Sequence, residues 1–199
     1  MKRKIVFDAV RRMLGRGFTI LEVRILDQVL DEAMRAGPDI RIPSHGVSLA
    51  GIRLIKAHEG CARLRADGRY EAYPDPGTGG APWTIGWGAT GADVRPGIVW
   101  TKEQCDRRLE ADIARHATDV ERVLDGCQTS QAQFDALVSF HFNTGAIGKA
   151  SLTKFHCQGE FDLAAGEFGK WRYAGGRVLK GLVRRRREEA ELYRSGVAQ

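Results

Sequence analysis

The chain has 199 residues, of which 43% are hydrophobic, and this is enough to bury the core of one domain with a small appendage. Its formal charge of +6 and its pI near 9.3 favour approach to nucleic acid, membrane surfaces or bacterial envelopes, without choosing among them. No apolar run approaches the length that a bilayer requires, which argues against a membrane span.

The N-terminus begins with a basic stretch, residues 1–4, followed by three apolar residues, as a secretory signal would. Charged residues from Asp8 onward interrupt the apolar run too early, and no small-residue cleavage site follows. We therefore expect no signal peptide, synthesis in a cytosol, and release by another agent if the substrate lies outside.

Two helices are predicted before the main domain. Apolar residues recur at helical spacing over residues 2–14, and the segment from Thr19 to Glu22 has the form of a capping box for a second helix to Ala36. Residues 39–46 show no periodicity and predict a linker. Because two helices alone bury little surface, we interpret residues 1–46 as a stabilising extension; a binding appendage is the alternative.

The next helix is expected to end at a glutamate. Ser48 is a suitable N-cap, and Leu49, Ile52 and Ile55 have the spacing of a buried stripe in a helix that reaches Glu59. A glutamate near a helix end is by itself most often solvated. The residues that follow Glu59 make it a candidate for chemistry.

Those residues predict a small antiparallel sheet. Residues 69–73 and 83–87 are typical of short strands, joined by a turn rich in Pro and Gly. Asp75 in the turn and Thr84 in the second strand would each be ordinary if taken alone. Two carboxylates and a hydroxyl on separate elements are, however, what acid/base hydrolysis of a glycosidic bond requires.

Helices are predicted for most of the remaining chain. Thr101 and Gln104 form a capping box for a long helix to Leu124, and further helices are expected over residues 131–142, over residues 161–171 and at the C-terminus. The arginine run 184–187 could contact nucleic acid. The neighbouring glutamates favour a solvated face with internal pairing instead.

Cysteine spacing argues against a structural metal site, because the four cysteines are far apart and none form a Cys-x-x-Cys pair: Cys61, Cys105, Cys127 and Cys157. We expect neither a metal nor a cofactor, and His116 on the long helix is expected at the surface. A cytosolic origin favours free, buried thiols over one or two disulfides.

Three motifs in order carry a family resemblance. Glu59-Gly60, the Ala-Tyr-Pro-Asp of residues 72–75 and the Thr-Ile-Gly of residues 84–86 resemble the Glu, Asp and Thr catalytic motifs of the phage-type lysozymes, the endolysin muramidases of glycoside hydrolase family 24. Residues 133–145 resemble the family's second-lobe segment, and residues 181–187 its C-terminal motif. The resemblance extends in order over residues 48–193.

The resemblance implies an α+β, lysozyme-like catalytic domain over residues 47–199, with a small lobe of short antiparallel strands joined by a long helix to a larger helical lobe. It implies hydrolysis of the β-1,4 bond between N-acetylmuramic acid and N-acetylglucosamine in peptidoglycan, with inversion. Glu59 would be the general acid and Asp75 the base, with Thr84 orienting the water. No nucleic acid, membrane insertion or oligomer is expected.

The resemblance also implies that Phe142, Asn143 and Ser151 contact glycan, although a core role suits Phe142 equally well. The chain departs from the family pattern in its longer loops and in Ala89, which stands where a histidine is usual. Asp67 competes with Asp75 but lacks the Ala-Tyr-Pro context. The alternatives are a lytic transglycosylase or a retaining muramidase, in which Glu59 works without Asp75 as base, and a non-catalytic binding module for glycan or nucleic acid.

Overall fold

The computed structural model describes residues 3–18, 23, 46–75 and 79–197, and its contacts divide the chain into two compact units, Met1–Ser44 and His45–Gln199. In the first unit, helix α1 (Arg3–Leu14) confirms the first predicted helix. Phe18 then lies edge-on against Phe7, with ring centroids 5.5 Å apart. The predicted second helix and linker lie outside the described residues, apart from Val23 and Gly46.

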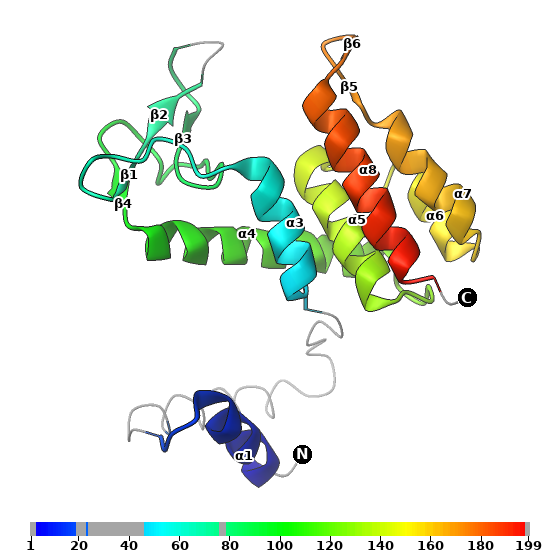
Figure 1. Cartoon of the computed structure of the whole chain (residues 1–199), viewed down its shortest axis with the longest axis horizontal. Helices are drawn as coiled ribbons and strands as arrows, with labels where there is room; N and C mark the ends of the chain where they lie inside the picture. The colour runs from blue at the N-terminus through cyan, green and yellow to red at the C-terminus, as the bar shows by residue number, and fades with distance from the viewer. Residues whose placement is uncertain (1–2, 19–22, 24–45, 76–78, 198–199) are drawn as a thin grey trace. The chain divides into compact units, whose positions relative to one another are not determined.

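Two antiparallel two-stranded ribbons form the small lobe of the second unit (Figure 1). Strand β1 (Tyr70–Glu71) pairs with β4 (Val99–Trp100), and β2 (Tyr73–Pro74) pairs with β3 (Trp83–Thr84). The first predicted strand is therefore divided at Ala72, whose backbone N–H donates to Ile98 O at 2.9 Å. Strand β4 was not predicted, because a two-residue strand carries no detectable alternation.

Two helices with local start signals connect the lobes. Helix α3 (Leu49–Glu59) begins at Ser48, whose side chain accepts a hydrogen bond from the backbone of Ala50, as predicted. Helix α4 (Lys102–Val123) begins with the predicted capping box of Thr101 and Gln104. Figure 1 shows α4 running from the ribbons of the small lobe to the helices of the large one.

The large lobe is helical. It contains α5 (Gln131–Thr144), α6 (Ser151–Cys157), α7 (Phe161–Glu167), the 3-10 turn η2 (Phe168–Lys170) and α8 (Lys180–Ser195), with a hairpin of β5 (Tyr173–Ala174) and β6 (Arg177–Val178) before α8. Helix α5 packs on α3, α4 and α8, and α6 packs on α7. None of the helices within the described ranges is long and apolar enough to cross a bilayer.

Helix α5 is the centre of the core. Its residues from Gln133 to His141 are all buried, and the ring of Phe140 lies edge-on to those of Phe168 and Trp171, with centroids 5.6 and 5.2 Å away. The helix ends at Gly145, whose left-handed φ of +64° suits a glycine C-cap. Ending the helix at residue 142 was therefore wrong, because residues 143 and 144 are still helical.

One disulfide corrects the prediction of four free thiols. Cys127, in the segment after α4, is bonded to Cys157 at the end of α6, with their Cα atoms 4.9 Å apart. Cys61 and Cys105 are free, and Cys105 is buried. The pairing could not be inferred from spacing, since it depends on how α4 and α6 meet in space.

Candidate active site

Glu59 is the last residue of α3, and Gly60 ends the helix with a φ of +62°. The Glu59 side chain is 21% exposed, and its Oε1 accepts a hydrogen bond from Arg185 Nη1 at 2.7 Å. Arg185 lies on α8 and is almost fully buried. The predicted acid is therefore partly buried and held by a guanidinium group that comes from the far end of the chain.

The segment of residues 84–88 lies directly against Glu59. A Cβ atom added to Gly88 would stand 3.4 Å from Glu59 Oε2, and Gly88 has the left-handed φ of +88° that glycine tolerates best. Ala62 N–H also donates to Gly86 O at 3.2 Å. The structure thus joins the chain after Glu59 to the segment that Thr84 begins.

Asp75 directly follows strand β2, which pairs with the strand that contains Thr84. Tyr73 of β2 stands opposite Thr84 of β3, so their side chains share one face of the ribbon. Asp75 is the first residue after β2, two residues from Tyr73. Its backbone closes the loop by pairing with Gly79 and Gly80 at 2.8 and 3.0 Å.

Asp67, the competing acid, has a structural role. Its Oδ1 accepts a hydrogen bond from the backbone N–H of Arg69 at 3.1 Å, and its Oδ2 accepts one from Arg69 Nη2 at 2.9 Å. These bonds from Arg69 lower the pKa of Asp67. Asp67 is therefore a turn former that pairs with its own neighbours, which leaves Asp75 as the better candidate.

A buried charge network lies behind Glu59. Glu189, fully buried on α8, accepts hydrogen bonds from Arg185 Nε at 3.1 Å, from Arg186 Nη2 at 3.1 Å and from Ser139 Oγ at 2.7 Å. Burial raises the pKa of Glu189. Arg186 Nη2 also donates to Asn143 Oδ1 at 3.0 Å, so hydrogen bonds connect Glu59 with Asn143.

The predicted solvated face of the arginine run was wrong for two of its members. Arg185 and Arg186 are 3% and 1% exposed, and burying them is tolerable because Glu189 pairs with both. On the outer side of α8, Arg184 pairs with Glu188 at 2.8 Å, which confirms the internal pairing there.

The three predicted glycan contacts lie on two helices. Phe142 is half-buried at the last turn of α5, packs on the core and has its ring centroid 4.8 Å from that of His116. His116 is itself half-buried, not a surface residue as predicted. Asn143 is exposed beside Phe142, and Ser151 is exposed at the start of α6. Their contact with glycan stays a prediction.

A cluster around Asp106 was missed from the sequence. Asp106 on α4 accepts hydrogen bonds from Trp87 Nε1 at 2.7 Å, Lys56 Nζ at 3.0 Å and Lys102 Nζ at 2.6 Å. Burial opposes its charge, but these donors outweigh burial and lower its pKa to about 2. The cluster fixes the 84–88 segment to α3 and α4. Of this cluster, the sequence could indicate only the pair of Lys102 and Asp106, which are four residues apart on one helix.

No metal-binding group was found in the parts of the chain that the structure describes: no three His, Cys, Asp or Glu side chains gather there as ligands would.

A long helix joins a small lobe of antiparallel ribbons to a helical lobe, and a glutamate lies where the lobes meet. This architecture is the α+β fold of lysozyme-like proteins. The Phage lysozyme family matches residues 56–189, and the chain belongs to that family. This match spans all three predicted catalytic residues and the arginine run of α8.

Individual relatives agree with this assignment. The chain is 40% identical over 152 residues to an endolysin of Bacillus phage B103, covering 75% of this chain and 54% of that protein. The muramidase domain of SpmX from Asticaccaulis excentricus has a similar structure, with a TM-score of 0.64 and 32% identity over 75% of this chain and 97% of that one. The endolysin from Escherichia coli O157:H7 phage FAHEc1 also gives a TM-score of 0.64, with 30% identity over 78% and 98%.

Proposed function

We propose that this chain is an endolysin muramidase, which hydrolyses the β-1,4 bond between N-acetylmuramic acid and N-acetylglucosamine in peptidoglycan. The observation that supports it best is the placement of Glu59, partly buried, bonded to Arg185 and in contact with the 84–88 segment. Membership of the phage lysozyme family and the relatives named endolysin or muramidase support the same activity.

In the proposed mechanism, Glu59 gives its proton to the glycosidic oxygen as the bond from that oxygen to the anomeric carbon breaks. Asp75, ionised, takes a proton from a water that Thr84 orients, and the water oxygen bonds to the anomeric carbon from the opposite face. Inversion requires room for this water, with the carboxyl groups about 6.5 to 9.5 Å apart. Solvent then returns the proton from Asp75 to Glu59.

The contact with Arg185 shapes the role of Glu59. A guanidinium beside a carboxylate favours the charged form, whereas a general acid must carry a proton. Arg185 also donates to Glu189 and to the backbone oxygen of Ser139, at 3.1 Å in each case. Because Glu189 offsets the charge of Arg185, we infer that Arg185 mainly orients Glu59.

The same proposal includes the glycan contacts, the domain boundaries, the oligomeric state and the place of action. Phe142, Asn143 and Ser151 contact the glycan, with Asn143 held by its bond from Arg186. Residues 47–199 form the catalytic domain and residues 1–46 an extension that stabilises it. The enzyme acts as a monomer on the cell wall, after release from the host cytoplasm in which it is made.

The direct test is the release of reducing ends from purified sacculi. Glu59→Gln keeps the shape of the side chain but removes the transferable proton, so turnover should fall about a hundredfold or more, and Asp75→Asn should cause a similar loss. Glu110→Gln, on the exposed side of α4, is the matched control and should retain wild-type turnover. Near wild-type clearing by a folded Glu59→Gln variant would refute the assignment.

Product analysis separates hydrolysis from the lytic transglycosylase alternative. Hydrolysis by water predicts muropeptides with ordinary reducing ends in the mass spectrum, and an inverted anomer among the first products seen by NMR. Anhydro ends would show that no water enters the bond. Binding to sacculi without any product would indicate the non-catalytic module.

A further inference from the structure

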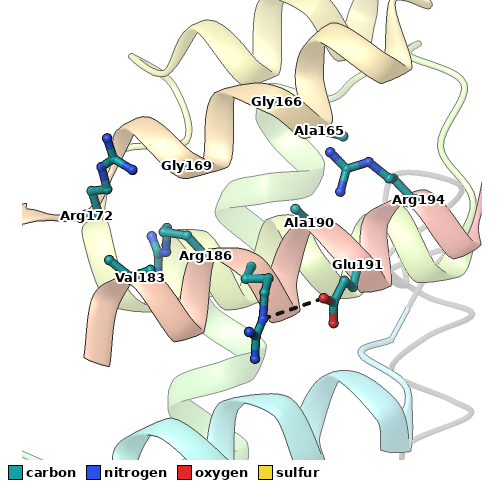
Figure 2. A pocket seen from close by; sticks show the side chains of 10 residues that line it. Ala165, Gly166, Gly169, Arg172, Val183, Arg186, Ala190, Glu191 and Arg194 are labelled. Atoms are coloured by element: carbon teal, nitrogen blue, oxygen red, sulfur yellow. Dashed lines mark ion pairs between the residues drawn. The ribbon is translucent and has the colours of Figure 1, made fainter. Parts of the chain in front are cut away.

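A hollow of about 280 Å³ lies between α8 and the α7–η2 segment, away from the partners of Glu59. Figure 2 shows Gly166 and Gly169 on one side of it and Ala190 on the other, with Arg172 and Arg194 at opposite ends. Four arginines line the hollow, and Glu191 is the single acid among its lining residues. It is therefore a concave surface with small residues along both sides and positive charge around it.

Two glycines keep this space open. A Cβ atom at Gly166 or Gly169 would meet nothing within 4 Å, and neither residue has the left-handed backbone that would require glycine. Glycine is also unfavourable inside a helix, where Gly166 lies. Backbone geometry thus does not explain these two residues, and a larger side chain at either of them would extend into this open space.

Several guanidinium groups around the hollow have N–H donors without a hydrogen-bond or ion-pair partner in the described ranges. Arg186 is 1% exposed, and its Nη1 has no hydrogen-bond partner among the described residues. Among the residues that the structure describes, neither Arg172 nor Arg194 forms an ion pair with a carboxylate. Arg187 Nε lies 3.6 Å from Glu191 Oε1, which is a long ion pair. A buried N–H without an acceptor is unfavourable, and an anion bound at Arg186 Nη1 would supply the missing acceptor.

We propose that this hollow binds a phosphate group carried by a polyol or sugar phosphate. A guanidinium group presents paired N–H donors that match phosphate oxygens, and several cations favour a phosphate over a single carboxylate. The space exceeds that of one phosphate, which leaves room for the polyol. A concave site is less suited to a flat lipid surface, and Val183 is the only large apolar side chain that lines it.

The test titrates glycerol 3-phosphate into the full-length protein by calorimetry, with sodium chloride at matched ionic strength as the blank. Arg172→Gln should weaken binding about tenfold, because one charge-assisted hydrogen bond to the phosphate is lost. Gly166→Leu leaves the charge unchanged but fills the hollow, and should weaken binding to the same degree. Arg107→Gln, an exposed arginine on α4, removes a charge elsewhere and should leave affinity unchanged.

Several outcomes would overturn the proposal: no heat beyond the chloride blank, unchanged affinity in Gly166→Leu, or an equal loss in Arg107→Gln, which would mean attraction by overall charge. Anionic vesicles of phosphatidylglycerol are the second arm. Binding to vesicles that depends on Arg172 and Arg194, without binding of glycerol 3-phosphate, would indicate a membrane surface instead. Turnover of sacculi that lack phosphate polymers should be equal in all variants, so the muramidase proposal is tested separately.

Discussion

At the scale of single residues, Glu189 is the charge on which the arrangement around Glu59 depends. It pairs with Arg185 and Arg186, and all three side chains are nearly removed from solvent. Arg186 also lies over the ring of Phe140 at 5.2 Å, which places this charged cluster inside the core of the helical lobe. Neutralising Glu189 would leave two buried cations with too few anions.

We therefore expect Glu189→Gln to lower the free energy of unfolding by about 3 to 5 kcal/mol, the typical effect of removing one partner of a buried ion pair. Urea unfolding measures the change. Glu191→Gln, two residues further along α8 and 63% exposed, is the matched control and should have no measurable effect. Equal stability of the two variants would contradict the buried network.

His156 provides a second residue-level prediction. Thr129 Oγ1 donates to Cys127 O at 3.1 Å, so it accepts from His156 Nε2 at 2.7 Å, and His156 Nδ1 accepts from the Tyr193 hydroxyl at 2.5 Å. A histidine that donates from Nε2 and accepts at Nδ1 carries one ring proton, so these hydrogen bonds require His156 to be neutral. Burial lowers the pKa of His156 to about 4, from an ordinary value of 6.5.

Because the unfolded chain binds this proton more readily, stability is complete above pH 6.5 and is lost as the pH falls towards 4. The loss from His156 should reach about 3 kcal/mol by pH 4. His156→Gln should flatten the dependence of unfolding free energy on pH between 6.5 and 4. The same slope in the variant and the wild type would show that His156 is not held neutral.

At the scale of elements, the disulfide ties the segment after α4 to the end of α6. It closes a loop with a sequence separation of 30, next to the buried His156. Cross-linking a loop of this length stabilises a fold by about 3.5 kcal/mol, chiefly through the unfolded chain.

Reduction of the wild type, or the double change Cys127→Ser/Cys157→Ser, should lower the free energy of unfolding by a similar amount and lower the melting temperature with it. The double variant is its own control, since reductant should not lower its melting temperature further. Denatured, unreduced wild type should contain two titratable thiols, Cys61 and Cys105. Four thiols under these conditions would contradict the pairing.

Elements with local signals were predictable, and those without were not. Helices α3 and α4 begin with capping residues and repeat apolar positions over several turns, so their sequences alone define them. Strand β4, the β5–β6 hairpin and helix α6 are too short to show a period. The order of the motifs predicted Glu59, Asp75 and Thr84 as catalytic residues. Arg185 could not be predicted in the same way, because it is 126 positions from Glu59 and only the folded chain brings these two residues together.

At the scale of the whole molecule, every candidate site residue belongs to the second unit, His45–Gln199. We expect deletion of residues 1–43 to leave most of the turnover on purified peptidoglycan, because the deleted part contributes no proposed catalytic group. Reducing-end release and circular dichroism on the deletion variant check this. A variant that folds normally yet has no turnover would show that the extension takes part in catalysis.

In the proposed mechanism, Glu59 and Asp75 face each other across a saccharide with room for a water between them. A crystal structure of Glu59→Gln with a bound peptidoglycan oligosaccharide measures this directly. We expect the side-chain ends of residues 59 and 75 on opposite faces of the scissile bond, about 6.5 to 9.5 Å apart. A glycan bound elsewhere, or side chains 59 and 75 on surfaces that share no glycan, would contradict it.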